Sequence, residues 1–455
     1  MKNKRTRERL LSLLTGLLFT ALLVLLTALF LAYRQNSVDT VPFDLGEITA
    51  DKTVDATDIS DCFLPAFLGV TAVGERSALI GTERTMAELY AMLSPAISEA
   101  LGSGNIREGT ADDWERLLSS DHTVYIRYHT ELPAAVIALF ANLERGVTPK
   151  EKRSGIDFYV SEAVLIPYIN GENAATSAFR QTDGSVKIIT VSMPREILST
   201  QDLAQFLRAY ETFFISFDFR KTGNGEIAAV CTDSVTARGI FMANNTAGIL
   251  RDNREETGQL IGVFGLNPDK LLSSHEEEDG SLSFIGTQGA FYIRTSSLEY
   301  RSSSEGGIGL SDLAGYAADS GIAGYIRACL ILEGEVKAVN RHYAGGDARL
   351  LLGGIQAENG TVSLTFYYVF DNIRIADTPP ALTATFENGV LREASLYTLT
   401  AQSTGRRVRT YSEEWFLGWL AGKSGAMSAA EVSLVYRADF VSDQVPAQWR
   451  AAGRT

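Results

Sequence analysis

The chain has 455 residues, of which 45% are hydrophobic and 21% are charged, a composition typical of a globular protein and unlike that of a disordered chain. Asp and Glu outnumber Lys and Arg by 55 to 41, and the resulting net charge of −14 argues against a nucleic-acid-binding protein. At roughly 100–200 residues per domain, two to three domains are expected.

An uncharged run of 24 residues, Leu10–Tyr33, predicts a transmembrane helix, because about 20 apolar residues suffice to cross a bilayer. Since basic residues stay on the cytoplasmic side, residues 1–9 are expected to form a cytoplasmic basic tail and the rest an extracytoplasmic ectodomain of a single-pass cell-membrane protein. The alternative is a cleaved signal peptide. Its apolar region would be shorter, about 7–15 residues, and would end at a small-x-small site that this run lacks, which favours an uncleaved signal anchor over residues 10–33. The basic residues before the run are Lys2, Lys4, Arg5, Arg7 and Arg9.

Small side chains recur every four residues along the predicted transmembrane helix, except at Val24. Positions four apart share one helix face, and small residues there allow a second helix to approach closely. We therefore expect a transmembrane interaction face, with a plain anchor as the alternative. Its residues are Ser12, Gly16, Thr20, Ala28 and Ala32.

The expected ectodomain is acidic, with 35 Lys and Arg against 54 Asp and Glu after residue 34. Its three cysteines are widely spaced, which allows at most one disulfide, and its four histidines show no metal-ligand spacing. Neither a metal nor another cofactor is predicted.

Helix and strand patterns divide the ectodomain into four parts and predict an α+β fold, with antiparallel sheets and packed helices in several domains. The parts are a juxtamembrane tether at 34–60, an N-terminal α+β domain at 61–235, a central β-rich module at 236–310 and a C-terminal β-rich domain at 311–455.

In the N-terminal domain, apolar spacing predicts a helix over 83–101 that Pro95 should kink. Thr110 is suited to cap a second helix. His122–Thr130 alternates as a strand, and Pro133 is expected in the first turn of a helix that ends at Leu143. Further predicted elements are a strand over Val186–Met193 and a helix over Thr200–Phe214.

Three Gly-containing pairs predict β-hairpins: Asp279-Gly280, Asn359-Gly360 and Asn388-Gly389. Ala290–Tyr300 is expected to be the longest strand of the central module. Trp415 and Trp419 lie four apart on a predicted short helix and are expected to pack into the core. One strand face should gather Val362, Leu364, Phe366, Tyr368 and Phe370.

No catalytic motif was found: Gly-x-Ser-x-Gly, a Walker loop, HExxH and CxxC are all missing from the sequence. The acidic run His275–Asp279 could bind calcium weakly, but a solvated loop is the favoured interpretation because EF-hand spacing is absent. Tyr367-Tyr368 and Trp415 with Trp419 could offer platforms for glycans, although packing is favoured. We therefore predict a protein that is not an enzyme.

Three stretches together resemble the YycH and YycI family of extracytoplasmic regulators. They are "HTVYIRYHTELPAAVIALF" at His122–Phe140, "FGLNPD" with "DGSLSF" and "LEYRS" within Phe264–Ser302, and Leu364–Leu399 followed by "VSLVYRADF" and "VPAQWR". The third is similar to the family's C-terminal YycI-like module, and assigns that module to 311–455.

The resemblance implies a non-catalytic protein that modulates a membrane sensor histidine kinase of a cell-wall-related two-component system. The contacts would be transmembrane and extracytoplasmic, and a paralogous regulator would be a further candidate partner. The alternatives are an extracytoplasmic binding module for cell-wall glycan or lipid, and a membrane-tethered hydrolase.

Overall fold

The computed structural model describes residues 62–72, 74–144, 158–166, 175–191, 200–221, 227–243, 250, 253–314, 321–424, 431–438 and 445–452. The chain divides into two compact units, Met1–Asp51 and Lys52–Thr455, and all of the described residues lie in the second. The predicted basic tail, transmembrane helix and tether lie outside the described residues. Within the described ranges, no helix is long and apolar enough to cross a membrane.

The fold is α+β, as predicted, and its first sheet has the strand order β3-β7-β6-β5-β4-β1-β2-β8-β9. Its strand pairs are antiparallel. The strands are β1 (Phe67–Ala72), β2 (Glu75–Leu79), β3 (Asn105–Gly109), β4 (His122–Pro133), β5 (Tyr159–Leu165), β6 (Ala175–Arg180), β7 (Val186–Val191), β8 (Ile215–Lys221) and β9 (Ile227–Cys231).

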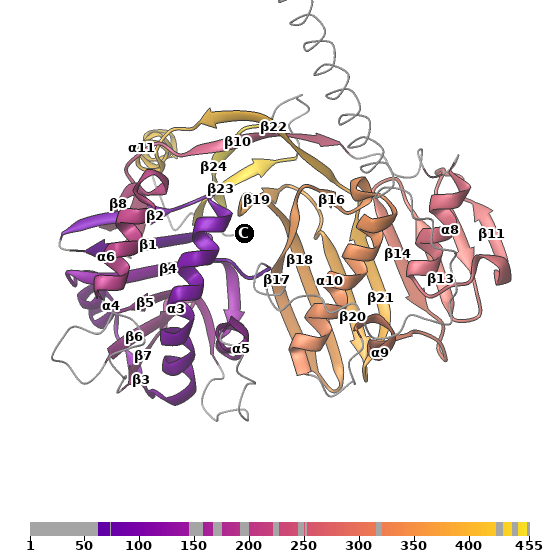
Figure 1. The fold of residues 1–455 in the computed structure, drawn as a ribbon, viewed down its shortest axis with the longest axis horizontal. Helices are drawn as coiled ribbons and strands as arrows, with labels where there is room; N and C mark the ends of the chain where they lie inside the picture. The colour runs from indigo at the N-terminus through magenta and orange to yellow at the C-terminus, as the bar shows by residue number, and fades with distance from the viewer. Residues whose placement is uncertain are drawn as a thin grey trace, which may run out of the picture. The chain divides into compact units, whose positions relative to one another are not determined.

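Helices α3 (Glu83–Ser103), α5 (Ala134–Glu144) and α6 (Thr200–Ala209) lie over one face of this sheet (Figure 1). The predicted helix over 83–101 is confirmed as α3, which contains Pro95. The helix predicted over 200–214 ends earlier, and a 3₁₀ turn at Glu211–Phe213 follows it.

Helix α4 (Ala111–Leu118) is capped by Thr110, as predicted. The Thr110 hydroxyl accepts the backbone N–H of Asp113 at 3.1 Å, and the Asp113 carboxylate accepts the N–H of Thr110 at 3.2 Å. Pro133 was expected to begin a helix, but it is the last residue of β4, opposite Tyr159, and α5 starts at Ala134. The fixed φ of proline is compatible with a strand end as well as with a first helical turn, so the sequence left this boundary ambiguous.

The second sheet has the order β11-β12-β13-β14-β21-β20-β18-β19-β23-β24, with β15 paired to β21 and β17 to β18. It is antiparallel except where β19 and β23 pair in parallel. The strands are β11 (Ser273–Glu276), β12 (Leu282–Ile285), β13 (Gly289–Ile293), β14 (Ser297–Ser302), β15 (Ile308–Gly309), β17 (Arg349–Glu358), β18 (Thr361–Phe370), β19 (Ile373–Ala376), β20 (Leu382–Glu387), β21 (Val390–Tyr397), β23 (Glu431–Arg437) and β24 (Ala447–Ala452).

The three predicted hairpins are confirmed. Asn359 and Gly360 join β17 to β18 with φ values of 50° and 80°, and Asn388 and Gly389 join β20 to β21 with the same values. Both φ values are positive, as a type I′ turn requires. Gly280 lies in the turn between β11 and β12. The predicted face of β18 is buried along its whole length.

One prediction for this part of the chain is wrong. Ala290–Tyr300 is not one strand: the N–H of Arg294 donates to the carbonyl of Ser297, and the chain turns between β13 and β14. The range 311–455 contains many strands and also the 19-residue helix α10 (Gly321–Val339), which was not predicted. Glycines at 321, 324 and 334 weaken the sequence signal of this helix.

Helices α8 (Arg254–Val263), α9 (Leu310–Ala314) and α10 accompany the second sheet (Figure 1), and the Tyr325 ring of α10 packs edge-on against Phe386 of β20. The β11–β14 strands join β21 in one sheet, so this sheet continues across residue 310. The domain boundaries at 235 and 310 remain predictions. Short 3₁₀ turns occur at Pro268–Lys270 and Arg341–Tyr343.

A third, small sheet has the order β10-β22-β16, with β10 (Thr236–Ala243), β22 (Thr400–Arg409) and β16 (Gly345–Gly346). We call the antiparallel pair β10 and β22 the arm. It forms a long ribbon that leads to helix α11 (Glu413–Ser424), as Figure 1 shows.

Candidate interaction surface

A row of side chains crosses four neighbouring strands of the first sheet. Arg127 of β4 lies opposite Phe67 of β1 on one side and Glu162 of β5 on the other, and Glu162 lies opposite Arg180 of β6. Arg180 forms an ion pair with Glu162, and the Arg127 guanidinium lies 5.1 Å from the centre of the Phe67 ring. Cations and a carboxylate therefore alternate across a largely buried sheet face, an arrangement that compensates each charge.

The first residue of α11 completes this row. The Glu413 side chain is only 3% exposed, and its Oε1 atom lies 3.8 Å from Nη1 of Arg127. Its Oε2 atom accepts the backbone N–H of Cys231 in β9 at 3.0 Å. Burial raises the pKa of Glu413, and the charge of Arg127 offsets this in part. The start of α11 is thus fixed to the first sheet by a buried carboxylate.

A second contact fixes the residues just before α11. The indole N–H of Trp449 in β24 donates to the backbone carbonyl of Tyr411 at 2.7 Å. Since Glu413 is fixed to the first sheet and Tyr411 to a strand of the second, the orientation of α11 is determined on two sides. The outward face of the helix is therefore presented in a defined direction.

That outward face is aromatic. Tyr411, Trp415 and Trp419 are 65%, 49% and 42% exposed, so the expectation that both tryptophans pack into the core is wrong. The inner positions are taken by Glu413 and by Leu417 and Leu420, which pack against the core. Because side chains four apart share a face, burying that set directs the tryptophans outward.

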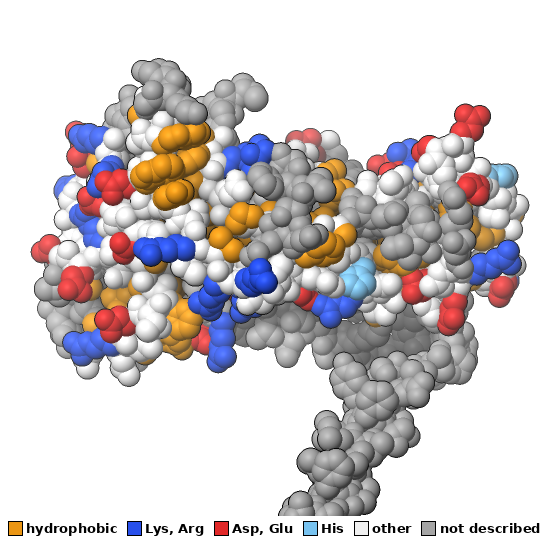
Figure 2. Space-filling view, turned by 90° about the horizontal axis from the view of Figure 1, so that it is seen from above, with side chains coloured by type: hydrophobic (Ala, Val, Ile, Leu, Met, Phe, Trp, Pro, Cys, Tyr) orange, Lys and Arg blue, Asp and Glu red, His pale blue; other side chains and the backbone are white. Residues whose placement is uncertain are grey.

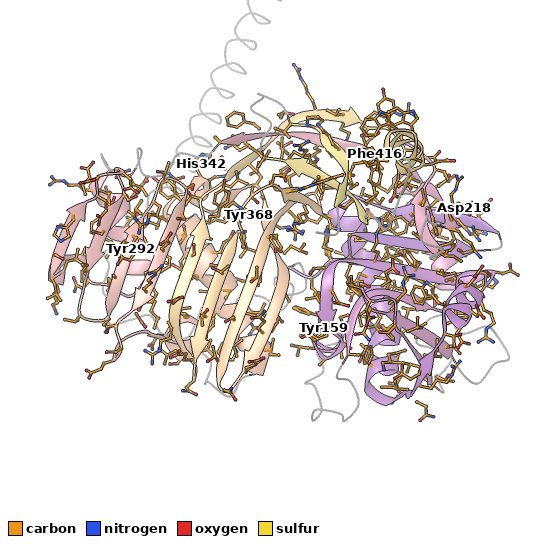
Figure 3. All side chains as sticks on the ribbon, turned by 180° about the vertical axis from the view of Figure 1, so that it is seen from behind. Tyr159, Asp218, Tyr292, His342, Tyr368 and Phe416 are labelled. Carbon is orange, nitrogen blue, oxygen red and sulfur yellow. The ribbon has the colours of Figure 1, made fainter. Side chains whose placement is uncertain are left out.

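The exposed rings contact one another or a partly buried neighbour. The centres of the Tyr411 and Trp415 rings are 4.2 Å apart, and that of Trp419 lies 5.8 Å from the ring of Phe416, which packs partly against the core. We call the three exposed residues, Tyr411, Trp415 and Trp419, the aromatic surface. Figure 2 shows hydrophobic side chains gathered on this face over α11, and Figure 3 shows aromatic rings around this helix, where Phe416 is labelled.

Exposed arginines precede the aromatic surface in the chain. Arg406 and Arg409 of β22 come shortly before α11, and β22 contains no acidic residue. Arg407 of the same strand lines the cleft described next. Glu414, the acidic residue next to Glu413, pairs with Arg220 of β8 at 2.7 Å. The segment from Arg406 to Trp419 is therefore a cationic, aromatic region on a chain that is acidic overall.

A cleft of about 600 Å³ lies where the start of α3 meets the arm and the turn between β18 and β19. Its three carboxylates each pair with an arginine: Asp371 with Arg238 at 3.2 Å, Glu83 with Arg349 at 2.8 Å, and Asp347 with Arg341. Burial raises the pKa of Asp371, which Arg238 opposes. Carboxylates held by arginines fit a structural role better than the acid–base pair that a hydrolase would need.

The predicted transmembrane face, Ser12, Gly16, Thr20, Ala28 and Ala32, lies outside the described residues. Across the described ranges, no group of three or more His, Cys, Asp or Glu is placed to hold a metal ion. The acidic run His275–Asp279 forms one side and the turn of an exposed hairpin. His129 lies 3.4 Å from the Asn372 side chain, and burial lowers its pKa to about 4.

The remaining aromatic and thiol candidates are mostly buried. Tyr368 is buried and donates to the carbonyl of Tyr397 at 2.9 Å, so it cannot serve as a glycan platform. The Arg374 guanidinium lies 3.6 Å from the centre of the Tyr367 ring. Cys62, Cys231 and Cys329 are buried and form no disulfide, and burial raises the pKa values of Cys231 and Cys329. Raised pKa values argue against nucleophilic roles for those two residues.

Comparisons with known proteins concern the fold. No protein-family model matches the chain, and no curated protein sequence matches it. A solved structure, that of YycH from Bacillus subtilis, matches with a TM-score of 0.55 at 8% sequence identity, covering 86% of this chain and 94% of that one. The chain is therefore similar in fold to YycH along almost the whole length of that protein.

Proposed function

We propose that the chain is a non-catalytic, membrane-anchored regulator that modulates a sensor histidine kinase of a cell-wall-related two-component system. The observation that carries this proposal is the YycH-like fold, which extends over 86% of the chain. The sequence resemblance to the YycH and YycI family, made from residues 122–140, 264–302 and 364–450, points in the same direction.

The contacts of such a regulator would be of two kinds. Within the membrane, the face of Ser12, Gly16 and Thr20 would pack against a helix of the kinase, since small residues permit close van der Waals contact in lipid. Outside the membrane, the ectodomain would contact the kinase or a paralogous regulator. The YycH-like fold supports the extracytoplasmic contact, and the transmembrane contact is supported by the sequence alone.

The test is co-purification of the kinase with the full-length chain. Gly16→Ile should reduce the recovered kinase by about tenfold, because a branched side chain separates the helices where they would approach most closely. Leu17→Ile, about 100° around the helix, is the matched control and should retain the kinase. Equal recovery with both variants would remove the transmembrane face from the proposal.

Topology is checked in the same cells. A cysteine introduced at Asp39 should react with a membrane-impermeant maleimide, and one at Asn3 should not. The three native cysteines are all buried, which keeps the background labelling low. Labelling at position 3 instead of position 39 would contradict an extracytoplasmic ectodomain.

A membrane-surface or glycan-binding module remains the second candidate, and one observation favours it. The exposed stripe of Tyr411, Trp415 and Trp419 is an arrangement that a purely structural helix does not need.

A further inference from the structure

Exposed aromatic residues are concentrated at one place in the structure. Among the described residues, eight large hydrophobic side chains are exposed, and three of them lie within the nine residues from Tyr411 to Trp419. Helix α11 therefore carries apolar side chains on its outer face as well as its inner one. A helix that is apolar on both faces is normally covered on both, so a binding partner is expected for the outer face.

We propose that the aromatic surface binds the headgroup layer of an anionic lipid bilayer and holds the ectodomain against the membrane. This proposal rests on the membrane anchorage proposed above, and it adds a second, peripheral contact to the anchor.

The residue types fit the boundary between water and lipid. Tryptophan and tyrosine combine a large apolar ring with one polar group, and for that reason they are enriched where a membrane meets water. Trp415 and Trp419 are four residues apart on α11, and the ring of Tyr411, just before the helix, stacks on Trp415, so the three form one stripe that a flat surface can meet at once. Because Glu413 and Trp449 fix the helix from behind, this stripe is already oriented before any contact is made.

The charges near the stripe favour an anionic surface. Arg406 and Arg409 precede it in the chain, and Glu414 at the start of α11 is paired with Arg220. In Figure 2, Lys and Arg side chains, together with some Asp and Glu side chains, lie around the hydrophobic group on the same face. Arginines next to aromatic rings match phosphate groups above acyl chains. A second copy docking through the same surface would instead bring arginines against arginines, and a neutral glycan would not need them.

The length of the chain limits how far the ectodomain can move from the bilayer. The described fold begins at Cys62, and 28 residues separate it from Tyr33, the end of the predicted transmembrane helix. Even at full extension, a segment of that length reaches only roughly 100 Å. A tethered surface acts at a high effective concentration, so a contact too weak to recruit a free protein suffices here.

The four tryptophans provide a direct test. Trp114 and Trp449 are buried, and the predicted transmembrane helix has no tryptophan, so Trp415 and Trp419 are the ones that bilayer contact would affect. The full-length chain would be reconstituted into vesicles of about three parts phosphatidylcholine to one part phosphatidylglycerol. Tryptophan fluorescence would be compared between vesicles with and without bromine on the acyl chains, since bromine quenches nearby indoles.

We expect bromine to quench up to about half of the wild-type emission, because two of the four tryptophans would touch lipid. Trp415→Phe with Trp419→Phe keeps the rings apolar and should abolish the quenching. Arg406→Gln with Arg409→Gln keeps both tryptophans and should reduce the quenching to the value found in phosphatidylcholine alone.

Three results would overturn the proposal. The first is wild-type quenching no greater than that of the double Phe variant. The second is quenching that is the same in neutral and anionic vesicles. The third is an absence of bromine quenching combined with tryptophans that become better protected from aqueous acrylamide as the protein density in the vesicles rises. That result would indicate a protein partner. Flotation of the double Phe variant with the vesicles reports the anchor separately, so failure of the anchor is distinguished from failure of the aromatic surface.

Discussion

The two large sheets differ in how they bring interacting residues together. The first sheet places a row of alternating charges, Arg127, Glu162 and Arg180, on a buried face and closes it with Glu413, which lies 286 positions beyond Arg127 in the chain. The second sheet is organised by short hairpins around an apolar strand, β18. The charged row of the first sheet therefore joins residues distant in sequence, whereas the hairpins β17–β18 and β20–β21 of the second sheet pair strands that are neighbours in sequence.

This difference indicates which sheet is suited to carry a functional surface. The charged row of the first sheet is also the seat of α11, the helix that carries the aromatic surface. A buried ion pair is weak evidence for net stability, because desolvation offsets the attraction, but it fixes which groups must meet. The charged row is thus suited to orienting α11. The hairpins of the second sheet instead set the register between the strands of that sheet.

The largest expected effect comes from breaking the charged row. Glu413→Ala should lower the free energy of unfolding by about 3–5 kcal/mol, since it leaves Arg127 as a buried charge without its nearest carboxylate. Denaturant unfolding of the full-length chain measures this. Replacing both residues with apolar ones, Arg127→Met with Glu413→Leu, should cost less than either single change.

An exposed ion pair on the same sheet supplies the control. Lys187 of β7 pairs with Glu108 of β3, whose side chain is 76% exposed. Glu108→Ala should cost less than about 1 kcal/mol, because solvent screens such pairs. If Glu413→Ala were as mild as Glu108→Ala, the charged row would not hold α11, and the contrast between the two sheets would be lost.

A smaller effect is expected at a hairpin turn of the second sheet. Gly389→Val should cost about 1–3 kcal/mol, because Gly389 has φ 80° and a β-branched residue is strained there. Asn388→Gly is the matched control in the same turn, at φ 50°, and should be much milder. Thermal unfolding of the three proteins gives the comparison. Similar melting temperatures for both variants would mean that the turn does not constrain the sheet.

The contrast between contacts that are local in sequence and contacts that are distant in sequence also explains which features the sequence could predict. Turns and caps depend on residues two to four apart, so Asn388-Gly389 and Thr110 could be recognised directly. The charged row could not, because Arg127, Glu162 and Glu413 are brought together only by strand order and by the seating of α11. Trp415 and Trp419 were misplaced for a related reason: their four-residue spacing shows that they share a face but not which face is inward. The buried Glu413 decides that, and its partner, Arg127, lies in β4 of the first sheet, far away in the sequence.

The third prediction concerns a contact that is local in sequence, the capping box of α4, the helix between β3 and β4 of the first sheet. Hydrogen bonds from Arg107 and from the backbone of Thr110 lower the pKa of Asp113 to about 2. Because the pKa in the folded state lies below the unfolded value of about 4, the carboxylate stabilises the fold above pH 4, and this contribution is lost as the pH falls through 2. The melting temperature of wild type should therefore exceed that of Asp113→Asn by a constant amount near neutral pH, and the gap should close between about pH 4 and pH 2.

Asp112→Asn, in the same helical turn, is the matched control and should show a smaller gap at neutral pH. A gap for Asp113→Asn that persists unchanged at pH 2 would mean that the carboxylate charge does not contribute. The cap would then act through the Thr110 hydroxyl alone, as a neutral hydrogen bond that sequence can predict and pH cannot alter.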